Sequence, residues 1–175
     1  ERLDAVREIE ASGWRAANRL PALIVMRRDP DAAVRAAAAQ AIGHVVTQLA
    51  TAVAATSSVP PRLAADFETA LGVLESQPPD ALDSPLFELL RDSDATVRAV
   101  AEQEIVRIAA RLSRIATEGF WVQTSKGPER RVDRFASKLL RELATLINHD
   151  DADLAMRAMR MAPGFGRAAH TILPA

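Results

Sequence analysis

One short acidic pattern, D-x-D-x-x-(V/M)-R-A, occurs three times in this chain of 175 residues and constrains its fold more than any other feature. Residues 29–45 align without gaps to residues 92–108 with nine of seventeen positions identical, and a weaker third copy covers residues 151–159. The copies begin 63 and then 59 residues apart. Three copies at nearly equal spacing predict a repeated supersecondary unit.

Each copy follows an amphipathic stretch, at residues 14–28, 84–91 and 131–148. An Asp before a helix accepts hydrogen bonds from the free N–H groups of the first turn, and a second acid there is favoured by the helix dipole. The arginine falls about one turn into the helix, where it can reach back to an acid. We therefore expect each unit to be a helix, an acidic turn and a second helix.

This pattern resembles the HEAT repeat, especially its short alanine-rich bacterial form. The resemblance implies an α-solenoid of stacked antiparallel helix pairs. It also implies that the aspartate and arginine of each copy belong to a structural hydrogen-bonded ladder between pairs, made of Asp29, Arg35, Asp92, Arg98, Asp151 and Arg157. HEAT units usually have about 40 residues, so intervals near 60 require either an inserted helix or a degenerate copy between the clear ones.

The two intervals differ in pattern. Residues 60–79 begin and end with a proline pair and carry a helical stripe that includes Leu63, Phe67 and Leu74, which predicts an extra helix near 62–76. Residues 117–130 lack helical periodicity and are interpreted as a long surface loop.

The composition agrees with an all-α chain, because aromatic residues make up only 4% and tyrosine is absent. A net charge of −1 excludes a globally basic nucleic-acid binder, although it permits a local basic patch. The absence of cysteine excludes disulfides and thiolate metal sites. No apolar run is long enough to span a membrane and no signal-like start is visible, so we expect a cytoplasmic protein.

The helix expected after the first acidic turn is unusually rich in alanine, and small residues occupy both of its faces. Ala36, Ala39 and Gly43 lie opposite the main apolar face. Either neighbouring helices cover this second face, for example the helix near 62–76, or it is left open for a helix of a partner.

One basic cluster stands out between residues 126 and 141. If residues 131–148 are helical, several cations fall on one stripe opposite the apolar residues, and an aromatic side chain precedes them. The cluster consists of Trp121, Lys126, Arg130, Arg131, Arg134, Lys138 and Arg141. It is interpreted either as a patch for acidic protein or nucleic-acid backbone, or as an ordinary solvated helix face.

Residues for catalysis are scarce. His149 lies beside Asp150, Asp151 and Asp153, which superficially suggests a metal site, but the same acidic turn occurs twice without histidine. We expect no catalytic residue, no metal and no cofactor.

These observations favour a single HEAT-like domain over residues 1–175 that acts as a non-enzymatic scaffold for another protein. Because the sequence begins at Glu1 rather than Met, it is also compatible with a fragment of a longer protein that self-associates through its repeat ends. The alternative function is nucleic-acid binding, including action on damaged DNA, through the basic 126–141 face.

Overall fold

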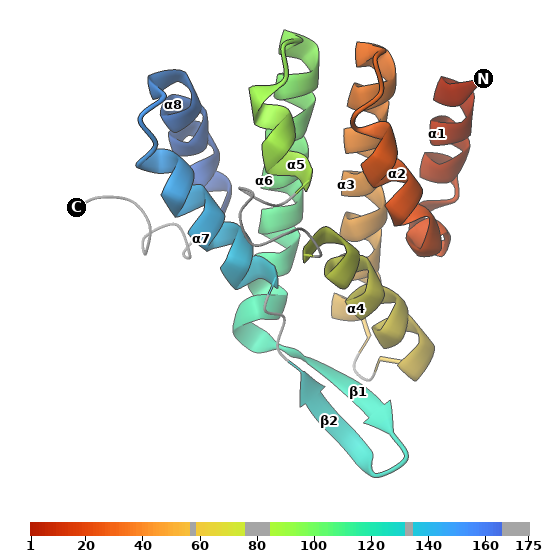
Figure 1. The fold of residues 1–175 in the computed structure, drawn as a ribbon. Helices are drawn as coiled ribbons and strands as arrows, with labels where there is room; N and C mark the ends of the chain where they lie inside the picture. The colour runs from red at the N-terminus through yellow and green to blue at the C-terminus, as the bar shows by residue number, and fades with distance from the viewer. Residues whose placement is uncertain (57–58, 76–84, 132–134, 166–175) are drawn as a thin grey trace.

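A computed structural model describes residues 1–56, 59–75, 85–131 and 135–165. Its helices lie side by side in two layers (Figure 1). The elements in chain order are α1 (Arg2–Ala11), η1 (Gly13–Arg19), α2 (Leu20–Met26), α3 (Ala32–Ala54), α4 (Pro61–Glu75), α5 (Pro85–Glu88), η2 (Leu89–Arg91), α6 (Ala95–Glu118), β1 (Phe120–Thr124), β2 (Gly127–Arg131), α7 (Phe135–Ile147) and α8 (Ala152–Met161).

The expected repeat of helix, acidic turn and helix is present. The helix pairs are α2 with α3, α5 and η2 with α6, and α7 with α8. The second helices α3, α6 and α8 pack against one another in order, and α1 continues their row beyond α3 (Figure 1). This row, formed by α1, α3, α6 and α8, is called the second-helix layer. The prediction of a mostly helical array of antiparallel pairs is confirmed.

The start of each second helix is fixed by an aspartate. The side chains of Asp31, Asp94 and Asp151 accept hydrogen bonds from backbone N–H groups in the first turns of α3, α6 and α8. These bonds satisfy donors that a helix start leaves free. The acidic turns are therefore helix caps.

The extra helix expected near 62–76 is confirmed as α4, whereas the loop expected at 117–130 is wrong. Helix α6 runs to Glu118, and residues 120–131 form an antiparallel hairpin in which Trp121 lies opposite Arg130. The first strand alternates between buried and exposed side chains, with Phe120 and Val122 buried. This alternation with period two explains why no helical periodicity is present.

The two insertions contact each other. The rings of Phe67 in α4 and Phe120 in β1 meet edge to face, with centroids 5.7 Å apart and an interplanar angle of 84°. The backbone N–H of Val59 donates to the carbonyl of Trp121 at 2.7 Å, and the backbone N–H of Gln123 donates to the carbonyl of Val59 at 3.3 Å. The long intervals of the sequence thus hold one shared structure beside the repeats (Figure 1).

The small residues of α3 are largely covered. Ala39 and Gly43 are buried, and Ala36 is half-buried. A side chain at Gly43 would overlap the carboxyl group of Glu104, which lies over it from α6. Alanine and glycine in this helix therefore allow close approach by the neighbouring second helix. Within the described ranges, none of the helices has the length and apolar character needed to cross a membrane.

Candidate functional site

The repeated arginines make the same local bonds in the first two copies. Nη1 of Arg35 donates to the carbonyls of Asp29 and Pro30, and Nη1 of Arg98 donates to those of Asp92 and Ser93. Each arginine thus closes its own acidic turn by binding backbone carbonyls rather than the aspartate side chain.

The far end of Arg35 joins two repeats. Its Nε and Nη2 donate to the two carboxylate oxygens of Asp92 at 2.7 and 2.8 Å, and both side chains are mostly buried. This bidentate geometry lowers the pKa of Asp92 and raises that of Arg35, chiefly through the hydrogen bonds between them. Asp29 has a corresponding partner, because Nη1 of Arg2 in α1 lies 3.2 Å from its Oδ2.

The third copy does not have the register that the sequence alignment predicts. Asp151 caps α8, so its structural equivalents are Asp31 and Asp94 rather than Asp29 and Asp92. The position of Asp29 and Asp92 is held by His149, whose Nδ1 accepts the backbone N–H of Asp151 at 3.0 Å. The third copy is therefore displaced by two residues.

This shift leaves Arg98 without an acid to bind in the next repeat. In the described part of the chain, Arg98 and Asp151 form no ion pair, and the buried Nε of Arg98 has no hydrogen-bond partner. Arg157 instead pairs with Glu102 of α6 at 2.7 Å and with Asp153 at 2.9 Å. These two hydrogen bonds raise the pKa of Arg157, that to Glu102 most.

Contrary to our prediction, the basic residues between 126 and 141 do not all lie on one helix. Lys126 is at the hairpin turn, Arg130 and Arg131 are in β2, and α7 begins only at Phe135. Arg134 and the side chains of Arg131 and Lys138 lie outside the described residues, while Arg141 is exposed on α7. Trp121 is 49% exposed on the hairpin, opposite Arg130.

A hollow that we did not predict runs along α3. One pocket of about 340 Å³ lies between Trp14, α3 residues from His44 onward, and Arg107 of α6. A second, of about 230 Å³, lies between the end of α3 and residues Ala110 and Arg111. The two pockets share Thr51 and Ala55. Together they are called the α3 groove, and their lining is mainly alanine and threonine.

Hydrogen bonds fix one end of the α3 groove. The backbone N–H of Trp14 donates to Oε1 of Gln48 at 3.1 Å, and the amide nitrogen of Gln48 lies 2.7 Å from Nε2 of His44. Gly13 allows this contact, because a side chain there would overlap Gln48 and because its φ of +56° suits glycine. The guanidinium of Arg15 lies over the Trp14 ring, 5.2 Å from its centroid. Trp14 is thereby held at the mouth of the groove.

Below Arg107 lies a buried acid. Glu104 is 1% exposed, its Oε1 lies 3.1 Å from Nη1 of Arg107, and its buried Oε2 has no hydrogen-bond partner among the described residues. Burial raises the pKa of Glu104 to about 7, and the charge of Glu10 acts in the same direction while Arg107 opposes them. The carboxyl group of Glu104 therefore changes its ionisation state near neutral pH.

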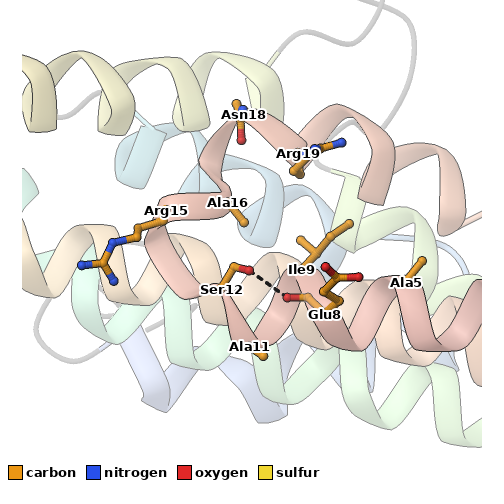
Figure 2. A pocket seen from close by; sticks show the side chains of 9 residues that line it. All are labelled: Ala5, Glu8, Ile9, Ala11, Ser12, Arg15, Ala16, Asn18 and Arg19. Carbon is orange, nitrogen blue, oxygen red and sulfur yellow. Dashed lines mark hydrogen bonds between the residues drawn. The ribbon is translucent and has the colours of Figure 1, made fainter.

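The larger pocket between α1 and η1 is a weaker candidate. It has a volume of about 590 Å³, but Figure 2 shows Arg15, Asn18 and Arg19 pointing in different directions around it. The hydrogen bond drawn there, from the hydroxyl of Ser12 to the carbonyl of Glu8 at 2.9 Å, is a local bond within one helical turn at the end of α1. Side chains that do not converge offer no defined site for one ligand.

The described residues contain no group of three His, Cys, Asp or Glu side chains that could hold a metal ion. The distribution of charged residues along the sequence already distinguishes the two helices that form the α3 groove. Residues 36–59 contain no charged residue, and residues 105–117 contain three arginines and no acid. Arg107 and Arg111 are spaced at i and i+4, which places them on one face of a helix.

Comparison with known proteins agrees with the repeat. A family model described as HEAT repeat matches residues 20–49, which include α2, the first acidic turn and most of α3. No curated protein matches the sequence. The crystal structure of an engineered protein is similar at 17% identity over 93% of this chain and 72% of that chain, with a TM-score of 0.28. Residues 20–49 are thus a HEAT repeat within a mostly helical chain.

Proposed function

We propose that this chain is a non-enzymatic scaffold that binds another protein along the α3 groove. HEAT repeats commonly mediate protein interactions, and stacked helix pairs present extended surfaces suited to them. The functional role comes from the surface of the second-helix layer, while the acidic turns hold that layer together.

The α3 groove is the observation that carries this proposal. Thr51 and Ala55 are exposed in the middle of it, and α3 has no charged side chain beyond Arg35 that could cover them. At one end, Trp14 is fixed by the hydrogen bond from its backbone N–H to Gln48. A rigid aromatic residue beside small apolar residues is typical of protein contacts, because burial there needs little ordering of side chains.

The experiment is site-specific photo-crosslinking. A photoreactive amino acid at Thr51 should crosslink a defined protein in cells that express the full chain, and the same group at Arg62, exposed on α4, should not. Thr51→Trp, which fills the groove from an exposed position, should abolish copurification of that protein. Equal crosslinking from both positions, or copurification unaffected by Thr51→Trp, contradicts the proposal.

Nucleic-acid binding through the hairpin is the second candidate function. Its support is Trp121, which is exposed on β1 with Arg130 opposite it on β2 and Lys126 at the turn. Phosphate contacts are strongest at low salt, so binding should be measurable with duplex and single-stranded DNA at about 50 mM salt and weakened by Arg130→Glu. Absence of binding under those conditions removes this candidate.

Self-association through the end of the array is compatible with the scaffold role. Met156 and Met159 are exposed on α8, which is the last described helix of the second-helix layer. Analytical ultracentrifugation of the wild type and of Met156→Lys measures this association. A monomer at all concentrations excludes it.

A further inference from the structure

The charged side chains that line the α3 groove are both arginines, and the acid beside them, Glu104, is buried beneath Arg107. Arg107 and Arg111 are the charged residues that line its two pockets, and both come from the same side of α6. The opposite wall and floor are α3, which has no charged residue after Arg35. A ligand in this groove therefore meets positive charge along one edge and neutral side chains elsewhere.

The two arginines differ in the ion pairs that they form within the chain. Arg111 is exposed and forms no ion pair within the described ranges. Arg107 uses Nη1 on Glu104, and its side chain remains 38% exposed. Since residues at i and i+4 lie about 6 Å apart on a helix surface, the two guanidinium groups are one helical turn apart. This spacing matches carboxylates one turn apart on a second helix.

The length and lining of the groove favour a helix as the occupant. From His44 to Ala55 the groove follows α3 for about 16 Å at 1.5 Å per residue, which is three turns. Alanine and threonine on its floor allow close approach of another backbone, as between stacked repeats. Trp14 offers an apolar contact at one end, and its ring is oriented by Arg15.

We infer that the α3 groove binds an acidic amphipathic helix of a partner protein, with two carboxylates one turn apart paired to Arg107 and Arg111 and with apolar side chains against Trp14 and Thr51. This inference rests on the proposed function and adds the chemistry of the partner. A nucleic-acid backbone fits less well, because its phosphates could pair with the arginines but would place no apolar group against the apolar floor of the groove.

The test is selection from a displayed library of 16-residue helical peptides on the full chain. The selected peptides should be enriched in Asp or Glu at i and i+4 beside an apolar stripe. Arg107→Gln and Arg111→Gln should each weaken their binding by about tenfold, as loss of an interfacial arginine typically does. Arg62→Gln removes the same charge on α4 and should leave binding unchanged.

Tryptophan fluorescence locates the bound peptide. The chain contains two tryptophans, so in Trp121→Phe the emission comes from Trp14 alone and should shift when a peptide is bound. Thermal unfolding by circular dichroism controls for the fold of each variant; Arg111 and Thr51 are exposed, so their substitutions should leave it intact.

Each remaining outcome has a distinct meaning. Peptides blocked by Thr51→Trp but not enriched in acids, or insensitive to both arginine substitutions, overturn the acidic partner and leave the scaffold function standing. Peptides that bind Thr51→Trp as well as the wild type, or a selection that yields none, overturn both. DNA binding at about 50 mM salt that is lost in Arg107→Gln and Arg111→Gln also overturns the inference.

Discussion

The two contacts of α6 with its neighbours in the second-helix layer differ, although an aspartate caps each of α3, α6 and α8. Toward α3, Arg35 binds both carboxylate oxygens of Asp92. Toward α8, the position of Asp92 is taken by His149, and Arg98 reaches no acid in the described part of the chain. The turn is thus a local property of each copy, whereas the bond between copies depends on one residue in the next repeat.

The packing of α6 differs in the same way on its two sides. Glu104 fills the space above Gly43 of α3, while Val106 fills the space beside Gly164, just after α8. The ion pair toward α8 is that of Arg157 with Glu102, and it lies outside the repeated pattern. The first junction therefore includes the repeated Arg35–Asp92 pair and a buried carboxyl group, and the second includes an ion pair of similar burial at positions outside the repeat.

The largest expected effect is the loss of Asp92. Asp92→Ala removes the partner of a mostly buried arginine, which typically costs about 3–5 kcal/mol of unfolding free energy. His149→Ala, at the equivalent position, should cost less than about 1 kcal/mol because no buried charge loses its partner. Urea unfolding of both variants measures the difference. Similar losses would show that the two junctions are energetically equivalent.

The next effect depends on pH. The pKa of Glu104 is raised from 4.5 to about 7, so the folded chain binds this proton more tightly than the unfolded chain. Stability should therefore fall as the pH rises from about 4.5 to 7, by about 3 kcal/mol in total. Glu104→Gln should remove this dependence. The unfolding free energy of the variant minus that of the wild type should therefore be more positive at pH 8 than at pH 5. Parallel stability curves for the two proteins would contradict the assignment.

A third prediction concerns the glycine beneath Glu104. Gly43→Ala should destabilise the chain by about 2 kcal/mol, because the new methyl group displaces a buried carboxyl group and overpacking typically costs 1–3 kcal/mol. In the Glu104→Ala background the same change should be neutral or stabilising, since alanine favours a helix more than glycine. A double-mutant cycle by thermal unfolding measures this coupling. Additive effects would mean that Glu104 is not the obstacle.

The smallest effect would make the second junction resemble the first. His149→Asp places a carboxylate where Asp92 stands in the preceding copy, so Arg98 gains an acceptor and stability should rise by about 1 kcal/mol. In Arg98→Gln the same substitution should give no gain. Chemical unfolding of the four proteins measures the interaction, and an equal gain in both backgrounds would assign it to Arg91, which contacts His149 instead.

The repeats, the caps and α4 were predictable because their signals are local. An aspartate before an alanine-rich helix and a stripe between proline pairs need no knowledge of distant residues. The hairpin had a local signal too, the alternation from Phe120 to Thr124, but this signal has a period of two residues and is not detected as helical periodicity. The displaced third copy was hidden because Asp151 and Arg157 are six residues apart, as are Asp29 and Arg35, although Asp151 is a cap.

The candidate site was less predictable, because it is formed between elements. Trp14 and Thr51 come from different helices, and Glu104 reaches Gly43 across the contact of α6 with α3. Neither pairing is visible in the spacing of residues along one helix. The charge pattern alone, with arginines on α6 and none on most of α3, could have pointed to this face.

The contact between α4 and the hairpin bears on how the chain unfolds. In a simple repeat array each unit touches only its neighbours, so the ends can open independently of the middle. Here the Phe67–Phe120 contact and the backbone pairing of Val59 connect the segment before the second helix pair to the segment after it. Opening the middle of the array therefore requires both insertions to separate, which couples the pairs into one more cooperative unit.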